Sequence, residues 1–453
     1  MATGIPKTKW NGELQTSNSD NEQFTFHPVW ENGNSANRLY FGDNISVMKD
    51  LLKDKSVKGK IRLIYIDPPY ATNSVFQTRK QKDAYTDLLT GEHYIDFIRE
   101  RLLLMKELLA TDGSIYVHLD NKMVFHVKVL MDEIFGAANF RSMITRKKCK
   151  SKNFTKNSFG NISDYILFYS KTANAVWNKQ FNEWTDEKVL MEFPFIEEET
   201  GRRHKRVPIH APGTRNGTTG KMWRGMMPPD GKHWQFTPDK LDEFDRKGEI
   251  YWSKNGNPRR KVYLDESSGI ALQDIWLDYL DVNNQNTQTT GYPTEKNIEM
   301  LKRIILASSN KGDLVMDCFA GSGTTLVAAD ELHRNWIGVD IGSESMNVIL
   351  NRFQNGTQTL DDHINDEKPK TKSTKVDLFS DQKEEEQKPR PKQLSKVQQH
   401  LITDFSILAN GNYSGTEFQL PTHLHSHFAL PNANANTAKQ KESASKRTTT
   451  VHD

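Results

Sequence analysis

The chain has 453 residues, 36% of them apolar, which is enough for two or three domains and a sizeable core. Its formal net charge is only +3, and its 2 cysteines exclude both a disulfide framework and a four-cysteine metal site. No apolar run approaches the length of a membrane span, and polar residues stand where a signal peptide needs its apolar core, so we expect a soluble, cytoplasmic protein.

The first regular elements follow a polar N-terminal arm. Residues 1–36 are rich in Asn, Ser, Gly and Glu, and we expect them to be loosely packed. Residues 38–41 are predicted to form a short strand that Gly42-Asp43-Asn44 stops, and a helix follows with its apolar face starting at Ile45. Residues 61–66 are β-branched and aromatic, which is typical of a buried strand.

The strand at 61–66 ends abruptly at Asp67-Pro68-Pro69-Tyr70. The two prolines remove backbone donors, so a carboxylate, two carbonyls and an aromatic ring are presented together just past the end of the strand. In open α/β sheets ligands bind at that edge. Taken alone, the stretch is as consistent with a rigid turn as with a catalytic site.

Strands and helices then alternate up to residue 171. Apolar residues recur at helical spacing over 95–109 and 124–134, and strands are predicted at 114–119, 142–146 and 165–169. This alternation predicts a doubly wound α/β fold with a mostly parallel sheet that is covered on both faces. His118 lies on a predicted strand among apolar neighbours, and we interpret it as structural.

The alternation fails between residues 172 and 290, where Trp, Gly, Pro and basic residues dominate. This segment contains enough aromatic residues to fold, so we interpret it as an inserted domain. The interleaving of aromatic residues with basic blocks favours binding to nucleic acid. The blocks lie at 146–152, 202–206 and 259–261. The pattern does not distinguish a core from base contacts for Trp223, Trp234 and Trp252.

Regular periodicity returns from residue 291 to 356. A helix begins near Ile298, a strand covers 314–319, a turn containing Gly321 and Gly323 leads into a helix, and a last strand ends at Asp340. Glycines let a ligand approach backbone N–H groups, and the N-terminus of the following helix adds a favourable dipole. Asp340 follows the turn by about 20 residues, where a doubly wound fold places the acid that binds ribose hydroxyls.

The same turn favours an adenosine cofactor without phosphates. A dinucleotide oxidoreductase needs a third glycine at the position of Leu326, and a phosphate loop needs the sequence Gly-Lys-Ser/Thr, which is absent. No cluster of His, Cys and Asp has the spacing of a metal site, so no metal is expected.

Two motifs together identify a family. Residues 317–325 (Asp-Cys-Phe-Ala-Gly-Ser-Gly-Thr-Thr) with residues 65–70 (Tyr-Ile-Asp-Pro-Pro-Tyr) resemble the S-adenosylmethionine-dependent amino-methyltransferases of DNA. Because the second motif precedes the first in the chain, the resemblance is to the circularly permuted β class, and specifically to adenine methyltransferases of type III modification subunits and their standalone relatives. It covers about residues 37–353, including Thr294-Glu295-Lys296, although Asn297 stands where the family usually has Pro.

The resemblance implies a Rossmann-like methyltransferase fold that is split in sequence. The catalytic half would cover 37–171, a target-recognition domain 172–290 and the cofactor-binding half 291–356. Residues 357–453 are charged and polar, so we predict a disordered tail with a short helix near 397–408 at most.

The resemblance also implies the chemistry. An exocyclic base amine is a poor nucleophile, and acceptors on both of its N–H bonds would direct its lone pair at a methyl donor. Asp67 and Pro68 would supply these acceptors, and Tyr70 a face on which a flipped purine stacks. The predicted catalytic residues are therefore Asp67, Pro68, Pro69 and Tyr70.

The implied cofactor is S-adenosylmethionine. The residues expected to bind it are Asp317, Phe319, Gly321, Gly323, Thr324, Asp340 and Lys296. When the strands are put in the order of the unpermuted fold, Asp43 follows the third strand. We therefore expect Asp43 to meet the adenine of the cofactor. The alternative for Asp43 is an Asx-turn or a helix cap.

The implied partners are double-stranded DNA, a restriction subunit and a second copy of the chain in a homodimer. An Asp at the first position of the DPPY motif favours adenine over cytosine as the target. Three alternatives stay open: N4-methylation of cytosine, methylation of RNA or of a protein amide, and a DNA-specificity subunit that has lost catalysis.

Overall fold

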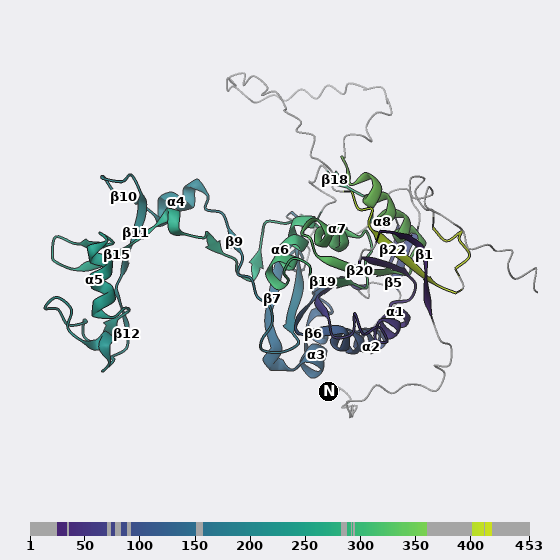
Figure 1. Ribbon diagram of the computed structural model, residues 1–453, viewed down its shortest axis with the longest axis horizontal. Helices are drawn as coiled ribbons and strands as arrows, with labels where there is room; N and C mark the ends of the chain where they lie inside the picture. The colour runs from purple at the N-terminus through teal and green to yellow at the C-terminus, as the bar shows by residue number, and fades with distance from the viewer. Residues whose placement is uncertain are drawn as a thin grey trace, which may run out of the picture. The chain divides into compact units, whose positions relative to one another are not determined.

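The fold is that of a computed structural model (Figure 1). It describes residues 25–33, 36–69, 74–77, 83–87, 92–150, 157–281, 288–290, 292, 295–359, 401–411 and 413–418. The chain divides into two compact units. The first combines Met1–Asn178 with Asp274–Asp453, and the second is Lys179–Gln273.

A ten-stranded sheet forms the centre of the first unit. In spatial order its strands are β1 (Phe26–Asn32), β22 (Phe405–Asn410), β2 (Arg38–Phe41), β20 (Asn335–Asp340), β19 (Leu314–Asp317), β3 (Ile61–Ile66), β6 (Leu109–Leu119), β8 (Ser163–Ser170), β7 (Phe140–Lys147) and β17 (Ile275–Trp276). The strands from β22 to β6 are parallel, and β8 is antiparallel to both β6 and β7. The prediction of a mostly parallel sheet is confirmed.

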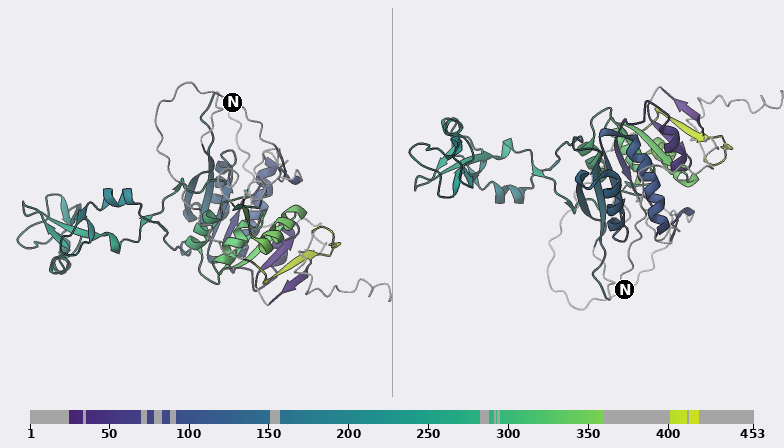
Figure 2. Two further views of the ribbon diagram at one scale, coloured as in Figure 1. Left: turned by 90° about the horizontal axis from the view of Figure 1, so that it is seen from above. Right: turned by 90° about the horizontal axis from the view of Figure 1, so that it is seen from below.

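Helices cover both faces of this sheet (Figures 1 and 2). Those whose apolar residues belong to the core on one face are α1 (Asn44–Leu51), α2 (Glu92–Leu108) and α3 (Val124–Phe135). Those on the other face are α6 (Ile298–Ser308), α7 (Thr324–Glu331) and α8 (Ser343–Asn355). The doubly wound α/β fold predicted from the alternation is therefore confirmed.

Strands from the two ends of the chain meet at the centre of the sheet. β19 and β20 come late in the sequence but lie between β2 and β3, which come early. Their parallel pairing matches Phe41 with Asp340 and Met316 with Ile64. The carboxyl ends of all four strands consequently lie at one edge, as the permuted order of the two motifs requires.

Two strands lie in segments that were predicted to be irregular. β1 falls in the predicted N-terminal arm, and β22 falls in the predicted disordered tail, where the sequence suggested a helix ending near residue 408. β22 runs between β1 and β2 and pairs with both. In β22 buried Phe405, Ile407 and Ala409 alternate with less buried residues, which is the period of a strand. The prediction of a wholly disordered tail was wrong for this segment because its partners lie far away in sequence.

Phe405 gives a test of this strand. It is fully buried, and its ring lies 4.7 Å from that of Trp30 and 5.2 Å from that of Phe353. We expect Phe405→Ala to lower the free energy of unfolding by about 3 to 5 kcal/mol because a large core side chain is lost. Leu401→Ala, at a side chain that is 52% exposed, should change it little. Urea denaturation of the full chain measures both, and equal stabilities of the two variants would contradict the placement of β22.

Smaller elements complete the first unit. β6 starts at Leu109, where the sequence suggested 114, because Leu109 already pairs with Ile61 of β3. A hairpin of β4 (Ser74–Gln77) and β5 (Asp83–Asp87) follows β3, and β18 (Gln288–Thr289) pairs with β21 (Gln358–Thr359). Among the described residues, no helix is long and apolar enough to cross a membrane, and no group of three or more His, Cys, Asp or Glu side chains could hold a metal ion.

The second unit lies within the range where the sequence predicts an inserted domain. Its largest sheet has the order β10 (Phe195–Ile196), β11 (Arg203–Pro208), β15 (Pro258–Tyr263) and β14 (Ile250–Trp252). The other strand pairs are β12 (His210–Pro212) with β13 (Lys232–Trp234) and β9 (Phe181–Asn182) with β16 (Ile270–Ala271). The helices are α4 (Asp186–Glu192) and α5 (Pro238–Arg246).

Tryptophans form part of the core of the second unit. Trp223 and Trp234 are 2% and 3% exposed and pack with Leu241 and Phe244. Trp252 is 37% exposed, and its ring stacks on that of Trp223 at 5.5 Å. Of the two interpretations left open by the sequence, the core is therefore the one that applies to Trp223 and Trp234.

Candidate active site

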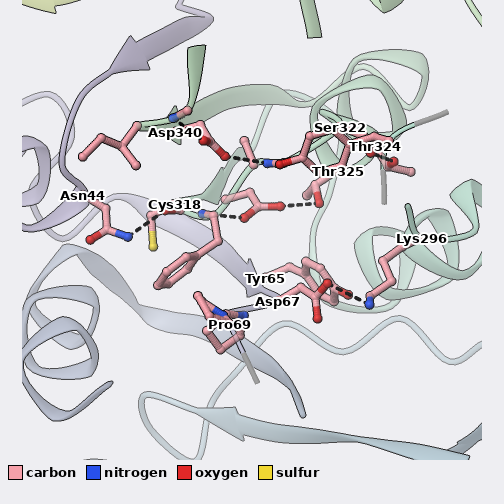
Figure 3. Close-up of a pocket in the computed structure, with 18 of the residues that line it drawn as sticks. Asn44, Tyr65, Asp67, Pro69, Lys296, Cys318, Ser322, Thr324, Thr325 and Asp340 are labelled. Atoms are coloured by element: carbon pink, nitrogen blue, oxygen red, sulfur yellow. Dashed lines mark hydrogen bonds and ion pairs between the residues drawn. The ribbon is translucent and has the colours of Figure 1, made fainter. Parts of the chain in front are cut away.

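A cavity of about 480 Å³ lies at the carboxyl edge of the main sheet (Figure 3). Its walls follow the ends of β2, β20, β19 and β3, where ligands bind in doubly wound folds. The predicted site residues that line it are Asp43, Asp67, Pro68, Pro69, Lys296, Asp317, Phe319, Gly321, Thr324 and Asp340. Tyr70 lies outside the described residues.

The glycine-rich turn joins β19 to α7. φ is +53° at Gly321 and +72° at Gly323, a left-handed backbone that favours glycine at both positions. A Cβ on Gly323 would lie 3.0 Å from Cγ1 of Ile349 in α8, so this glycine permits the turn and the packing of α8 and does not line the cavity. Gly321 does line it, without a side chain between the backbone and the cavity.

Asp340 ends β20 and holds the glycine turn. Its Oδ2 accepts the N–H of Gly321 and its Oδ1 accepts the N–H of Gly342, both at 2.8 Å. Burial raises the pKa of Asp340 above its ordinary value, although the two N–H donors oppose that rise. The position that the sequence assigned to ribose binding is therefore occupied by a partly buried carboxyl fixed to the turn.

Asp317 ends β19 on the opposite side of the turn. Its Oδ1 accepts the N–H of Phe319 at 3.0 Å, and its Oδ2 accepts the hydroxyl of Thr325 at 2.6 Å. Burial raises the pKa of Asp317 to about 7. A carboxyl of the cavity wall consequently titrates near neutral pH.

The raised pKa of Asp317 predicts a pH-dependent stability. Between the ordinary value of 3.8 and about 7, the folded protein keeps a proton that the unfolded chain loses, so this group makes the free energy of unfolding fall as pH rises. We expect Asp317→Asn to gain up to about 4 kcal/mol relative to the parent between pH 4 and pH 8. Urea denaturation of both proteins across this range measures the difference, and a difference independent of pH would contradict the prediction.

Asp43 has a structural role in addition to its place in the cavity wall. It is the N-cap of α1, where its Oδ2 accepts the N–H and the hydroxyl of Ser46 at 3.0 and 3.1 Å. Arg101 lies 3.6 Å from its Oδ1. The helix cap that the sequence left open is therefore present, and the contact with the cofactor stays a prediction.

Asp67 directly follows β3, and Pro68 and Pro69 continue the cavity wall. The Asp67 side chain is 17% exposed, and its Oδ2 lies 2.8 Å from Nζ of Lys296 (Figure 3). Lys296, which the family resemblance assigned to the cofactor, thus contacts the first residue of the DPPY motif.

Tyr65 of β3 also lines the cavity and leads into a buried polar chain. Its hydroxyl hydrogen-bonds to Nδ1 of His118 at 2.8 Å, and Nε2 of His118 lies 2.9 Å from Asp164. Asp164 in turn pairs with the guanidinium of Arg146. Although burial opposes it, His118 and Arg146 together keep the pKa of Asp164 well below its ordinary value. His118 is fully buried among these strands, in keeping with the structural interpretation.

Several lining residues were missed in the sequence. Phe97 and Arg101 of α2 line the cavity. The guanidinium of Arg101 lies 3.5 Å from the centroid of the Phe97 ring, and its Nε donates to Oδ1 of Asn44 at 2.7 Å. The sequence contained one signal for Arg101, which is a charged residue next to the apolar face of a predicted helix. Tyr292 and Glu295 also line the cavity, and no periodicity marks them because they precede α6 in a non-repetitive segment.

Comparison with known proteins decides the family. The DNA methylase model for N6 and N4 methyltransferases matches residues 61–351. The chain belongs to the DNA methylase family. It is 48% identical over 330 residues to the type II methyltransferase M.EcaI of Enterobacter cloacae, which covers 73% of this chain and 72% of that protein.

More distant relatives include both standalone and type III enzymes. The type III StyLTI Mod subunit of Salmonella typhimurium is 27% identical over 349 residues, or 67% of this chain and 51% of that protein. This chain thus spans about half the length of that Mod subunit. The DNA adenine methyltransferase YhdJ of Escherichia coli is 25% identical over 71% of this chain and 84% of its own length.

The protein is a DNA methyltransferase, and S-adenosylmethionine supplies the methyl group when bound. The residues of the cavity fit this group. Its sulfonium and ammonium charges suit a wall with the carboxyl groups of Asp317, which is buried, and Asp340, which is partly exposed. Gly321 leaves backbone accessible, and the ring of Phe319 adds an apolar surface for the uncharged parts of the molecule.

Proposed function

We propose that this methyltransferase modifies the N6 amine of a flipped adenine at a specific site in double-stranded DNA. One observation carries the proposal. The Asp67-Pro68-Pro69 stretch and the glycine turn, which come from opposite ends of the catalytic domain, line one cavity. This common cavity supports a site in which acceptors for an amine and a binding surface for a methyl donor lie within reach of each other.

The amine-binding residues act by alignment. The Asp67 carboxylate and the Pro68 carbonyl each accept one N–H of the amine, so its lone pair points at the methyl carbon. The nitrogen would gain the methyl group as the S–C bond of the donor breaks and a neutral thioether leaves, and the nitrogen would then lose one proton to solvent. Asp67 needs no function as a strong base because the methylated ammonium is acidic. Tyr70 is the proposed stacking surface for the extruded purine.

The proposed contacts to the methyl donor follow the glycine turn. Asp340 is assigned to the ribose hydroxyls, Asp317 to the ammonium group and Asp43 to the adenine. Phe319, Gly321 and Thr324 form the wall between them, and Gly323 shapes the turn. The short hydrogen bonds of both acids to the turn support this assignment, because they fix the carboxyl groups before the donor binds.

The second unit is proposed to recognise the DNA sequence. Arg206 lies over the rings of Phe195 and Tyr251 at 3.7 and 3.5 Å, and in the register of the sheet it is opposite Lys261 of β15. Guanidinium groups and aromatic rings bind phosphates and base edges. A restriction subunit and a homodimer are proposed partners, in a bacterial or phage system acting in the cytoplasm.

Nucleoside analysis tests the target base. The full-length protein is incubated with DNA and donor labelled in the methyl group, and the DNA is digested to nucleosides. We expect label in N6-methyladenine. Label only in N4-methylcytosine would replace the adenine assignment, and label only in RNA or protein added in parallel would reject DNA as the substrate. DNA binding without any transfer would indicate an inactive specificity subunit.

A further inference from the structure

The ion pair between Lys296 and Asp67 links the two halves of the cavity. Nζ of Lys296 lies 2.8 Å from Oδ2 of Asp67, and the side chains are 10% and 17% exposed. Lys296 precedes α6, whereas Asp67 follows β3. Figure 3 shows the Lys296 side chain directed toward the Asp67 carboxylate, with a dashed line between the two groups. A largely buried ion pair at this distance holds the two charged groups together, because little water is present to screen them.

The backbone on both sides of Lys296 is fixed. Glu295, at 4% exposure, pairs with Arg352 at 3.1 Å and accepts the N–H of Thr290 at 2.8 Å. Asn297 is the N-cap of α6 and accepts the N–H of Glu299 at 2.9 Å. The Asn that departs from the family pattern therefore supplies a cap where a Pro would not. Lys296 stands between a buried ion pair and a helix start, so the backbone that carries its side chain is fixed.

The same anchor reaches the glycine turn. Nη1 of Arg352 donates to Oγ1 of Thr324 at 2.7 Å and to the carbonyl of Ser322 at 3.3 Å. A continuous series of polar contacts thus joins the turn to Glu295, and through the neighbouring Lys296 to Asp67. The carboxylate that meets the amine is in this way oriented relative to the part of the wall that meets the donor.

We propose that Lys296 is a positioning residue for methyl transfer and does not bind the cofactor. Its ammonium donates to Oδ2 and fixes the rotation of the Asp67 carboxylate, in the orientation in which Asp67 accepts the N–H of the target amine. The proposal rests on the proposed function of Asp67. Alignment of an amine lone pair tolerates little error, and a displacement of about 1 Å lowers a rate by about 10²-fold.

The test separates the rate of transfer from donor binding. In Lys296→Met we expect the single-turnover rate to fall about 10²-fold, while the Kd for S-adenosylmethionine, measured by calorimetry, stays within about threefold. Lys296→Arg keeps a donor to Oδ2 and should recover part of the rate. In a background of Asp67→Asn, Lys296→Met should cause little further loss, because the two residues act as one unit.

Lys302→Met is the matched control. Lys302 lies on α6 and pairs with Glu299 and Glu331 at 2.8 Å, but does not line the cavity. It should leave rate and Kd unchanged. A raised Kd with an unchanged rate in Lys296→Met would show that Lys296 binds the donor. An equal loss of rate in Lys302→Met would show that the effect of Lys296→Met is a general loss of stability. Either result overturns this inference alone, whereas a parent enzyme that transfers no methyl group overturns the proposed function as well.

Discussion

Asp67→Ala is expected to lower the single-turnover rate of methyl transfer by about 10²- to 10³-fold, with little change in the affinity for S-adenosylmethionine. Alanine removes the only charged acceptor that the DPPY stretch offers to the amine. The donor is assigned to the other side of the cavity, around Asp317 and Asp340, so its binding should persist. Quenched single-turnover assays with tritiated donor give the rate, and calorimetry gives the Kd.

Two comparisons make that result specific to the position of Asp67. Asp50→Ala removes a carboxylate on α1 that pairs only loosely with Lys53, at 3.6 Å, and should leave the rate unchanged. Asp67→Asn keeps the shape and one acceptor oxygen but loses the charge, so its rate should lie between those of the parent and of Asp67→Ala. Residual activity of Asp67→Ala equal to that of the parent would remove Asp67 from the reaction.

Asp340→Ala is expected to raise the Kd for S-adenosylmethionine by about 10²-fold, whether or not DNA is present. A hydrogen bond to a charged group contributes about 1.5 to 3 kcal/mol, and the upper end of this range corresponds to that factor. The substitution also leaves the N–H groups of Gly321 and Gly342 without their acceptor, so the turn loses the bond that fixes it. Calorimetric titration of the folded variant measures the affinity.

Asp313→Ala is the matched comparison for Asp340. Asp313 lies at the opposite end of β19, where its carboxylate accepts the N–H of Asn310 at 2.8 Å. Asp313→Ala should lower the free energy of unfolding without changing the Kd for S-adenosylmethionine. If both variants weakened donor binding equally, the loss would reflect the sheet as a whole and the assignment of Asp340 to the ribose would fail.

Elements with strong local periodicity were predictable from the sequence. β3 and β20 are short apolar runs, and α3 and α6 repeat their apolar residues at helical spacing, so each could be placed without knowing its neighbours. The order of strands at the centre of the sheet also followed, because the two motifs imply which strand ends must meet.

Elements that depend on distant partners were not predictable in the same way. β1 buries only Phe26 and Trp30, and its strand conformation comes from pairing with β22, whose sequence lies in a polar tail. Both segments are short and lie in otherwise polar sequence, and the sheet supplies the hydrogen bonds that decide their structure. A single sequence contains no signal for that pairing.

The site shows the same division. Asp67 and Asp340 were predicted because each stands at the end of an apolar strand, and strand ends define the ligand edge. Asp317 was expected from the family resemblance. The contact of Lys296 with Asp67 joins two segments that no local rule relates, and the resemblance alone pointed Lys296 to the cofactor. For Asp43 the sequence left open a helix cap or a contact with the cofactor. The two are compatible, because Asp43 caps α1 and also lines the cavity.

Modified-base sequencing of host DNA tests the central claim most directly. DNA is taken from cells that express the parent protein, the Asp67→Ala variant or neither, and modified bases are read at single-nucleotide resolution. We predict N6-methyladenine at one short sequence motif in the first sample and its absence in the other two. N4-methylcytosine in the first sample, no modification in it, or the same modification with Asp67→Ala would contradict an adenine methyltransferase built around Asp67.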